Sequence, residues 1–191
     1  LNEALSSMVK KGCHFCFMEV SSHAIDQHRI RGLHFDIAVF TNITRDHLDY
    51  HRTFNNYINT KKSFFDSLSK KTVSIINIDD RYGSKMLMNT DSKKVFYSIK
   101  NKGHYQASIV EDTIAGLTMI IDDIQVSSEL IGEFNAYNLL TTYSVARELG
   151  QDKIKILQYL STIQAPPGRF NIIRSEQGLI AIVDYAHTPD A

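Results

Sequence analysis

Three apolar runs of the chain each lead directly into side chains that could do chemistry. The runs cover residues 15–18, 37–40 and 179–183. They continue into Glu19 with the serines and histidine at 21–23, into Asn42 with the run DHLDYH at 46–51, and into Asp184 with His187. In parallel α/β sheets, ligands bind at the carboxyl ends of strands. The sequence therefore predicts one functional site to which three strand ends contribute.

The carboxylate and imidazole groups of this pattern are suited to a metal ion. Glu19 is expected at the end of a strand buried on both faces, where an uncompensated carboxylate is costly. Mg²⁺ would offset that cost, because it takes a few carboxylates together with phosphate oxygens. His47 and His51 are four residues apart, which could place both on one helical face, as in zinc sites. No HExxH pattern accompanies them, so a zinc hydrolase is the weaker alternative.

Other familiar motifs are incomplete or absent. Cys13 and Cys16 have CxxC spacing, but no second pair completes a zinc site, so we expect both to pack in the core. Ser21 and Ser22 lack the GxSxG nucleophile pattern, and helix capping or substrate hydrogen bonding is expected for them. Neither GxxxxGK[ST] nor GxGxxG occurs, so these residues contain no phosphate-binding loop.

The elements that must position these groups follow from hydrophobic periodicity. Runs of strand type alternate with runs of helix type, which predicts an α/β fold with a mostly parallel sheet flanked by helices. Buried strands are expected at 15–18, 37–40 and 73–78, and a last strand is expected at 179–183. Helices are expected at 1–11, from Thr53 to 68, at 135–149 and at 152–163. Short β-rich runs at 95–99, 106–111, 117–122 and 124–130 predict a small antiparallel meander.

Composition excludes several classes of protein. The 191 residues carry 21 Lys and Arg against 21 Asp and Glu, so no basic face for nucleic acid is expected. No apolar run is long enough to span a bilayer, and two cysteines make no disulfide framework. We expect a cytoplasmic protein without membrane insertion. Because the chain starts at Leu1 and stops directly after a dense polar motif, we also expect a fragment.

Five ordered blocks, spanning residues 18 to 191, resemble the motifs of the Mur ligase family. They are MEVSSHAIDQHR at 18–29, FTNITRDHLDYH at 40–51, GEFNAYNL at 132–139, PGRF at 167–170 and DYAHTPDA at 184–191. The pairing of SSHA with QxR is similar to the branch of the family that adds the third residue of the peptidoglycan stem peptide. The resemblance implies the central P-loop-type ATPase domain over 1–166, here without its phosphate loop. It also implies the first strands of a Rossmann-like C-terminal domain over 167–191.

The activity that the resemblance implies is ATP-dependent amide ligation. The family phosphorylates the D-Glu carboxylate of UDP-MurNAc-L-Ala-D-Glu, and a diamino acid then attacks the acyl phosphate. ATP would be the cosubstrate and Mg²⁺ the cofactor, and such chemistry depends on charge placement more than on covalent catalysis. We expect a monomer whose partners are these small molecules. We also expect the isolated 191 residues to be inactive, and which diamino acid is added stays open.

The resemblance also implies roles for single residues. Glu19 and His47 would coordinate Mg²⁺, and Lys61 would carry a catalytic carbamate, an anion that can face the metal. The dipeptide substrate would be held by Ser21, Gln27, Arg29 and Asn42. The nucleotide side and the hinge would comprise Asn135, Asn138, Arg169, Asp184 and His187. A solvated helical lysine is the alternative for Lys61, and turn or capping structure is the alternative for the nucleotide-side residues.

Other functions remain open on the sequence alone. A sister enzyme, either another Mur ligase or a folylpolyglutamate-type synthetase, would keep the chemistry and change the substrate. A metal hydrolase built around His47, Asp49 and His51, or a catalytically silent binding module, would change the class of protein. Tightly held zinc would favour the hydrolase, and weak Mg²⁺ binding that depends on nucleotide would favour the ligase.

Overall fold

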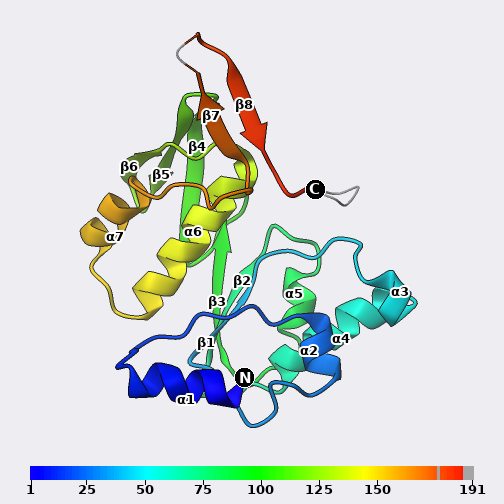
Figure 1. Cartoon of the computed structure of the whole chain (residues 1–191). Helices are drawn as coiled ribbons and strands as arrows, with labels where there is room; N and C mark the ends of the chain where they lie inside the picture. Colours follow the sequence, from blue (N-terminus) through cyan, green and yellow to red (C-terminus); the bar gives the residue numbers. More distant parts are fainter. Residues whose placement is uncertain (176, 187–191) are drawn as a thin grey trace. The chain divides into compact units, whose positions relative to one another are not determined.

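The computed structural model describes residues 1–175 and 177–186, and the chain forms two compact units, Leu1–Gly32 and Leu33–Ala191. The first unit contains α1 (Asn2–Lys10) and α2 (Ser22–Asp26) (Figure 1). The prediction of a helix over 1–11 is confirmed.

The prediction of a buried strand at 15–18 is wrong. These residues adopt no strand, and Phe15 and Phe17 are 57% and 76% exposed. Cys13 and Cys16 are exposed free thiols, which contradicts the expected core packing. An apolar run becomes a sheet strand only where a neighbouring strand supplies the ladder of backbone hydrogen bonds. No described strand pairs with this segment.

The second unit is built on a six-stranded sheet in the order β1-β2-β3-β4-β5-β6. Its first three pairings are parallel and its last two are antiparallel, so the predicted mostly parallel α/β fold is confirmed. The strands are β1 (Ile37–Phe40), β2 (Val73–Asn77), β3 (Lys93–Ser98), β4 (Tyr105–Thr113), β5 (Gly116–Ile121) and β6 (Ile124–Ser128). Ile37 pairs with Val73, which in turn pairs with Lys93.

The strand at 93–98 lies in a different part of the sheet from the one predicted. The run at 95–99 was expected in the antiparallel meander, but β3 lies parallel to β2 over five residue pairs. Val95 and Tyr97 are almost completely buried, as is typical of a central strand. The antiparallel part is β4–β6, and it continues the same sheet because β4 pairs with β3 at Tyr97 and Tyr105.

Local signals mark some of the helix ends in this unit, and the helices expected from Thr53 to 68, at 135–149 and at 152–163 are present with slightly different bounds. They are α3 (Leu48–His51), α4 (Phe54–Asp66), α5 (Gly83–Met86), α6 (Glu133–Glu148) and α7 (Lys153–Leu160). The Thr53 hydroxyl accepts a hydrogen bond from the Asn56 amide, and the Asp152 carboxylate accepts one from Lys155. Gly150, with a φ of +77°, follows the end of α6.

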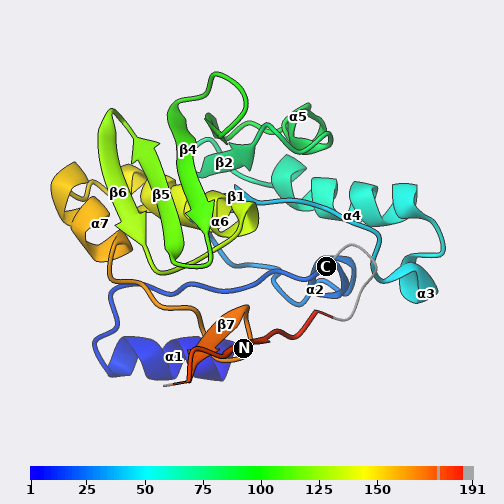
Figure 2. The same cartoon turned by 90° about the horizontal axis from the view of Figure 1, so that it is seen from above.

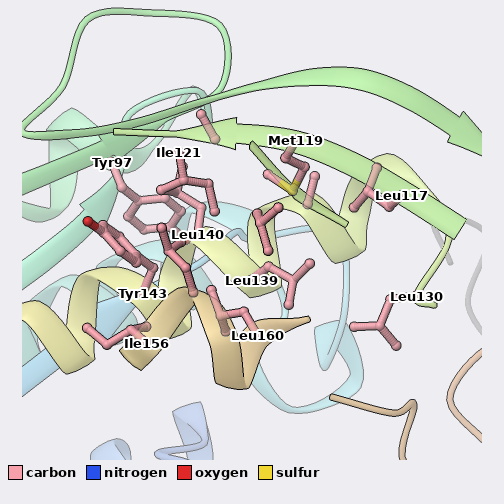
Figure 3. Packing of buried hydrophobic residues seen from close by; sticks show 14 of the residues in the cluster. Tyr97, Leu117, Met119, Ile121, Leu130, Leu139, Leu140, Tyr143, Ile156 and Leu160 are labelled. Atoms are coloured by element: carbon pink, nitrogen blue, oxygen red, sulfur yellow. The ribbon is translucent and has the colours of Figure 1, made fainter. Parts of the chain in front are cut away.

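The hydrophobic core lies between the sheet and the helices α6 and α7. Figure 2 shows α6 and α7 along one face of β4, β5 and β6. Side chains from the strands pack there against both helices, and the cluster includes Tyr97, Leu117, Met119 and Ile121 from the strands and Leu139, Leu140, Tyr143, Ile156 and Leu160 from the helices (Figure 3). This packing holds α6 and α7 against the sheet.

A short antiparallel hairpin, β7 (Asn171–Arg174) with β8 (Ile180–Val183), ends the described chain. The run at 179–183 does form a strand, β8, but its side chains are exposed and it pairs antiparallel with β7 outside the six-stranded sheet. The strand β7 was not predicted. Phe170, just before β7, packs edge-on against Phe134 of α6, with ring centroids 5.2 Å apart. The division into domains at residue 166 stays a prediction. Among the described helices, none has both the length and the apolar character required to cross a membrane.

Candidate functional site at the carboxyl ends of the strands

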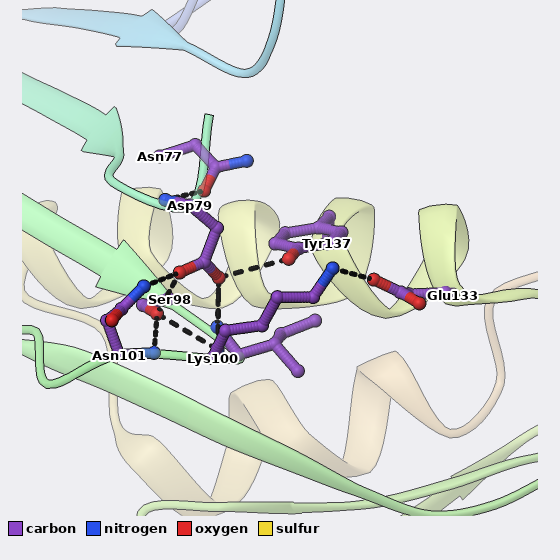
Figure 4. A network of polar contacts seen from close by, with 8 residues as sticks. Asn77, Asp79, Ser98, Lys100, Asn101, Glu133 and Tyr137 are labelled. Atoms are coloured by element: carbon purple, nitrogen blue, oxygen red, sulfur yellow. Dashed lines mark hydrogen bonds and ion pairs between the residues drawn. The ribbon is translucent and has the colours of Figure 1, made fainter. Parts of the chain in front are cut away.

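The carboxylate of Asp79, two residues beyond β2, is the centre of a polar network (Figure 4). Its Oδ1 accepts hydrogen bonds from the Ser98 hydroxyl at 2.6 Å and the Asn101 side-chain amide at 2.7 Å. Its Oδ2 accepts from the Ile99 and Lys100 backbone amides at 2.7 and 3.1 Å, and from the Tyr137 hydroxyl at 3.0 Å. One side chain thus joins the ends of β2 and β3 to α6.

Burial and hydrogen bonding act in opposite directions on Asp79. Partial burial raises the pKa of its carboxyl group, but the hydrogen bonds from Ser98, Asn101, Ile99 and Lys100 outweigh burial and leave the pKa below its usual value. The pKa of Tyr137 is raised by burial and by its hydrogen bond to this carboxylate. Asp79 is therefore an anion at neutral pH, and Tyr137 is its neutral donor.

The loop after β1 is tied to the same network. The Asn77 side-chain amide donates to the Thr41 carbonyl at 2.9 Å, and the Asn77 Oδ1 accepts from the Asp79 amide at 3.0 Å. Asp80 accepts from the Ile43 amide at 3.1 Å. Gly83 approaches this turn so closely that a Cβ there would lie 2.2 Å from the Asn77 carbonyl oxygen, so the position accepts only glycine.

A second cluster forms around the buried ring of Tyr57 on α4. The rings of His47 and His51 lie 5.9 and 5.3 Å from that of Tyr57, and the Lys61 ammonium nitrogen lies 5.8 Å from its centroid. Two of the predicted catalytic residues, His47 and Lys61, thus each lie near the Tyr57 ring. His47 has a left-handed backbone with a φ of +54° and precedes α3, so it does not share a helical face with His51.

The predicted metal ligands are placed as follows. His47 Nε2 lies 3.5 Å from Asp46 Oδ2, and both side chains are partly exposed. Glu19 is exposed and belongs to the other compact unit, so the expected buried carboxylate at a strand end is wrong. No group of three or more His, Cys, Asp or Glu side chains in the described residues is placed to hold a metal ion. One or two protein ligands suffice, however, for a Mg²⁺ ion that phosphate oxygens and water also coordinate.

The predicted substrate residues of the first unit make local contacts. The Ser21 hydroxyl caps α2 by accepting from the Ala24 amide at 3.2 Å. The Arg29 guanidinium donates to the Gln27 side-chain oxygen, and both residues are exposed. Asn42, in the second unit, is exposed beyond the end of β1. Whether these four residues bind a substrate stays a prediction.

The predicted nucleotide-side residues divide into two places. Asn135 is buried at the start of α6 and donates to the Ile131 carbonyl, and Asn138 donates to Asn135 Oδ1 at 3.2 Å. Arg169 lies over the Tyr185 ring, 5.4 Å from its centroid. Asp184 accepts from the amides of Phe170 and Tyr185, as a turn residue does. His187 lies outside the described residues.

Sequence reasoning did not identify Asp79 and Tyr137. Asp79 and Asp80 follow β2, which is more completely buried than β1, so the strand-end argument applied to the other runs could have found them. Tyr137 offered no such signal, because its role depends on which face of α6 turns toward β2.

Comparison with known proteins gives a consistent result. The Mur ligase middle domain family matches residues 1–146. The UDP-N-acetylmuramoyl-L-alanyl-D-glutamate--2,6-diaminopimelate ligase of Parabacteroides distasonis is 49% identical over all 191 residues, which is 39% of that protein. The ligase of the same name from Cytophaga hutchinsonii is 51% identical over the same span. The chain therefore spans about two fifths of the length of these curated relatives.

A solved structure supports the same assignment. The structure of a UDP-N-acetylmuramoyl-L-alanyl-D-glutamate--2,6-diaminopimelate ligase matches 98% of this chain and 40% of its own, with a TM-score of 0.81 and 32% sequence identity. The five sequence blocks, the mostly parallel sheet with polar strand ends, and the family match over residues 1–146 agree with one another. On these grounds the chain belongs to the Mur ligase family.

Proposed function

We propose that the protein containing this chain is an ATP-dependent ligase of peptidoglycan precursor synthesis that joins a diamino acid to UDP-MurNAc-L-Ala-D-Glu. The observation that carries the proposal is the 49–51% identity, over every residue of the chain, to two ligases with that dipeptide in their name. Their names specify 2,6-diaminopimelate, which makes it the first candidate for the incoming amino acid. We place the reaction in the cytoplasm, since Cys13 and Cys16 are free thiols.

The proposed reaction has two steps. An oxygen of the D-Glu carboxylate attacks the γ-phosphorus of ATP, and the bond to ADP breaks. The amine of the diamino acid then attacks the acyl carbon, the carbon–oxygen bond to phosphate breaks, and the amine loses its proton. The products are the amide, ADP and inorganic phosphate. Such phosphoryl transfer depends on positioning and on neutralising charge.

The predicted site residues would divide this work. Asn42, Gln27 and Arg29 would hold the UDP-MurNAc-dipeptide, and a guanidinium is well suited to an anionic oxygen. Ser21 would join them beside its role as a helix cap. Asn135 and Asn138 would contact the adenine, and Arg169, Asp184 and His187 would serve the phosphates, the ribose and the hinge.

Mg²⁺ would be bound by the Glu19 carboxylate and the His47 imidazole together with nucleotide oxygens. A carboxylate and an imidazole are both metal-binding groups, and when bound the ion would neutralise charge on the phosphates. Lys61 would react with CO₂ to form a carbamate, which places a negative charge near His47. Their shared contact with the Tyr57 ring supports this arrangement.

Two neighbouring lysines provide a matched test in the full-length protein. Lys62 forms an ion pair with Asp66, whereas Lys61 lies over the Tyr57 ring. Product formation is measured by mass spectrometry with ATP, Mg²⁺, UDP-MurNAc-L-Ala-D-Glu and either meso-diaminopimelate or lysine. We expect product with diaminopimelate. We also expect Lys61→Ala to lower kcat by roughly a hundredfold or more, as loss of a charge aimed at the reacting group does.

The control Lys62→Ala should keep kcat within about twofold of the unchanged protein, because the Lys62 ammonium is paired with Asp66 on the same helix and no role in the reaction is proposed for it. Absence of ATP-dependent product with every diamino acid would refute the proposed function. Equal losses of activity in the two variants would refute the role of Lys61 alone.

A further inference from the structure

The network around Asp79 connects two parts of the site for which different ligands are proposed. At one end, the Asn77 side-chain amide donates a hydrogen bond to the Thr41 carbonyl. Thr41 is next to Asn42, which is proposed to bind the dipeptide substrate. At the other end, Asp79 accepts a hydrogen bond from Tyr137. Tyr137 lies in the first two turns of α6, between Asn135 and Asn138 in the sequence. These two asparagines are proposed to contact the adenine.

The first turns of α6 need such a directional contact. The helix is held against the sheet mainly by apolar side chains such as Leu139, Leu140 and Tyr143, and apolar packing is non-directional. The Tyr137–Asp79 hydrogen bond is directional and charge-assisted. It therefore restricts both the rotation of α6 about its axis and the shift of its first turns along that axis. The Lys100–Glu133 ion pair, 2.7 Å long, links the same loop and helix but is largely exposed.

Asp79 is itself held firmly in place. Four further donors, from Ser98, Ile99, Lys100 and Asn101, saturate its two oxygens and fix its orientation. An asparagine at position 79 would place an NH₂ group where one of the two carboxylate oxygens now accepts. At least two of the hydrogen-bond donors around it would then face a donor instead of an acceptor. The position therefore requires a carboxylate, for a reason that lies in the shape of the loop after β3.

We propose that Asp79 is a positioning residue for the nucleotide: through Tyr137 it holds the first turns of α6 so that Asn135 and Asn138 meet the base. This inference rests on the proposed function, since it assumes that the protein binds ATP. Asp79 touches neither ligand in this account. It acts through the helix that carries the contacts.

The same helix offers a matched control six residues further along. The Tyr143 hydroxyl donates to the Asp122 carboxylate, so this pair has the same chemistry as Tyr137 and Asp79. Tyr143 is completely buried and lies in the core, beyond the residues proposed to contact the nucleotide. Loss of either hydroxyl removes one tyrosine–carboxylate hydrogen bond from α6, but only one of the two bonds adjoins the nucleotide side.

The test compares Asp79→Asn and Tyr137→Phe with Asp122→Asn and Tyr143→Phe in the full-length protein. For each variant, kcat and the KM for ATP and for UDP-MurNAc-L-Ala-D-Glu are measured, together with the melting temperature. We expect the first two variants to raise the KM for ATP roughly tenfold while kcat at saturating ATP stays within about twofold. This result is typical of losing an interaction that binds the substrate and the transition state equally well. The control variants should leave the KM for ATP within about twofold and lower only the melting temperature.

The possible results distinguish a failure of the positioning role from a failure of the proposed function. Equal rises in the KM for ATP in both pairs, or no rise in any variant, would overturn the positioning role. If Asp79→Asn does not fold, Tyr137→Phe alone decides, because it leaves the loop after β3 intact. An unchanged protein with no ATP-dependent ligation would refute the proposed function instead.

Discussion

At the scale of single residues, Asp79 is the side chain on which the most contacts of the site converge. Hydrogen bonding lowers its pKa below the ordinary value of 3.8 despite the opposing effect of burial. A carboxyl group whose pKa is lower in the folded than in the unfolded protein stabilises the fold above the unfolded value. That contribution is lost as the pH falls through the folded pKa.

The resulting prediction concerns stability at acid pH. At neutral pH, Asp79→Asn should lower the free energy of unfolding by about 2 kcal/mol, the size of a lost hydrogen bond to a charged group. Below about pH 4 the difference between the two proteins should shrink, because Asp79 itself becomes protonated. Urea unfolding of both proteins over a pH series measures this difference. A difference that stays constant down to pH 2 would show that the charge of Asp79 is unimportant.

Which site residues the sequence could reveal depended on how local their signals are. His47 and Lys61 are predicted from the resemblance to the family, and both lie near the Tyr57 ring. Tyr137 could not be found, because its hydroxyl reaches Asp79 across 58 residues of sequence. Glu19 was expected to be buried only because the run before it was taken for a strand, and the structure leaves it exposed.

At the scale of elements, the start of α4 matters because this helix carries Tyr57 and Lys61. Thr53→Ala removes the cap hydrogen bond to the Asn56 amide and should lower the free energy of unfolding by about 1 kcal/mol. Thr53→Ser keeps the hydroxyl and should cost less than half as much. Urea unfolding curves of the two variants measure the effect, and equal losses would mean that the hydroxyl does not act as a cap.

Helix ends that depend on contacts within one turn could be predicted from the sequence. Strands that depend on pairing with a distant strand could not. The cap residues Thr53 and Asp152 and the glycine at 150 mark helix ends through contacts within one turn. The assignment of 95–99 failed because only pairing with β2 makes β3 a central parallel strand. The run at 15–18 has the composition of a strand but no described partner strand.

At the scale of the whole molecule, the central claim is that this chain is part of a ligase that makes an acyl phosphate. The chain covers about two fifths of its curated relatives, so that claim concerns the full-length protein. In the proposed reaction, one carboxylate oxygen of D-Glu leaves with the phosphate. This transfer distinguishes the acyl-phosphate route from hydrolysis of ATP that merely accompanies ligation.

The most direct measurement is therefore transfer of ¹⁸O. Full-length protein is given ATP, diaminopimelate and UDP-MurNAc-L-Ala-D-Glu labelled with ¹⁸O in the reacting carboxylate, and the phosphate released is analysed by mass spectrometry. The account predicts one ¹⁸O atom in each phosphate formed together with product. Product formation with unlabelled phosphate, or phosphate release without any product, would contradict it.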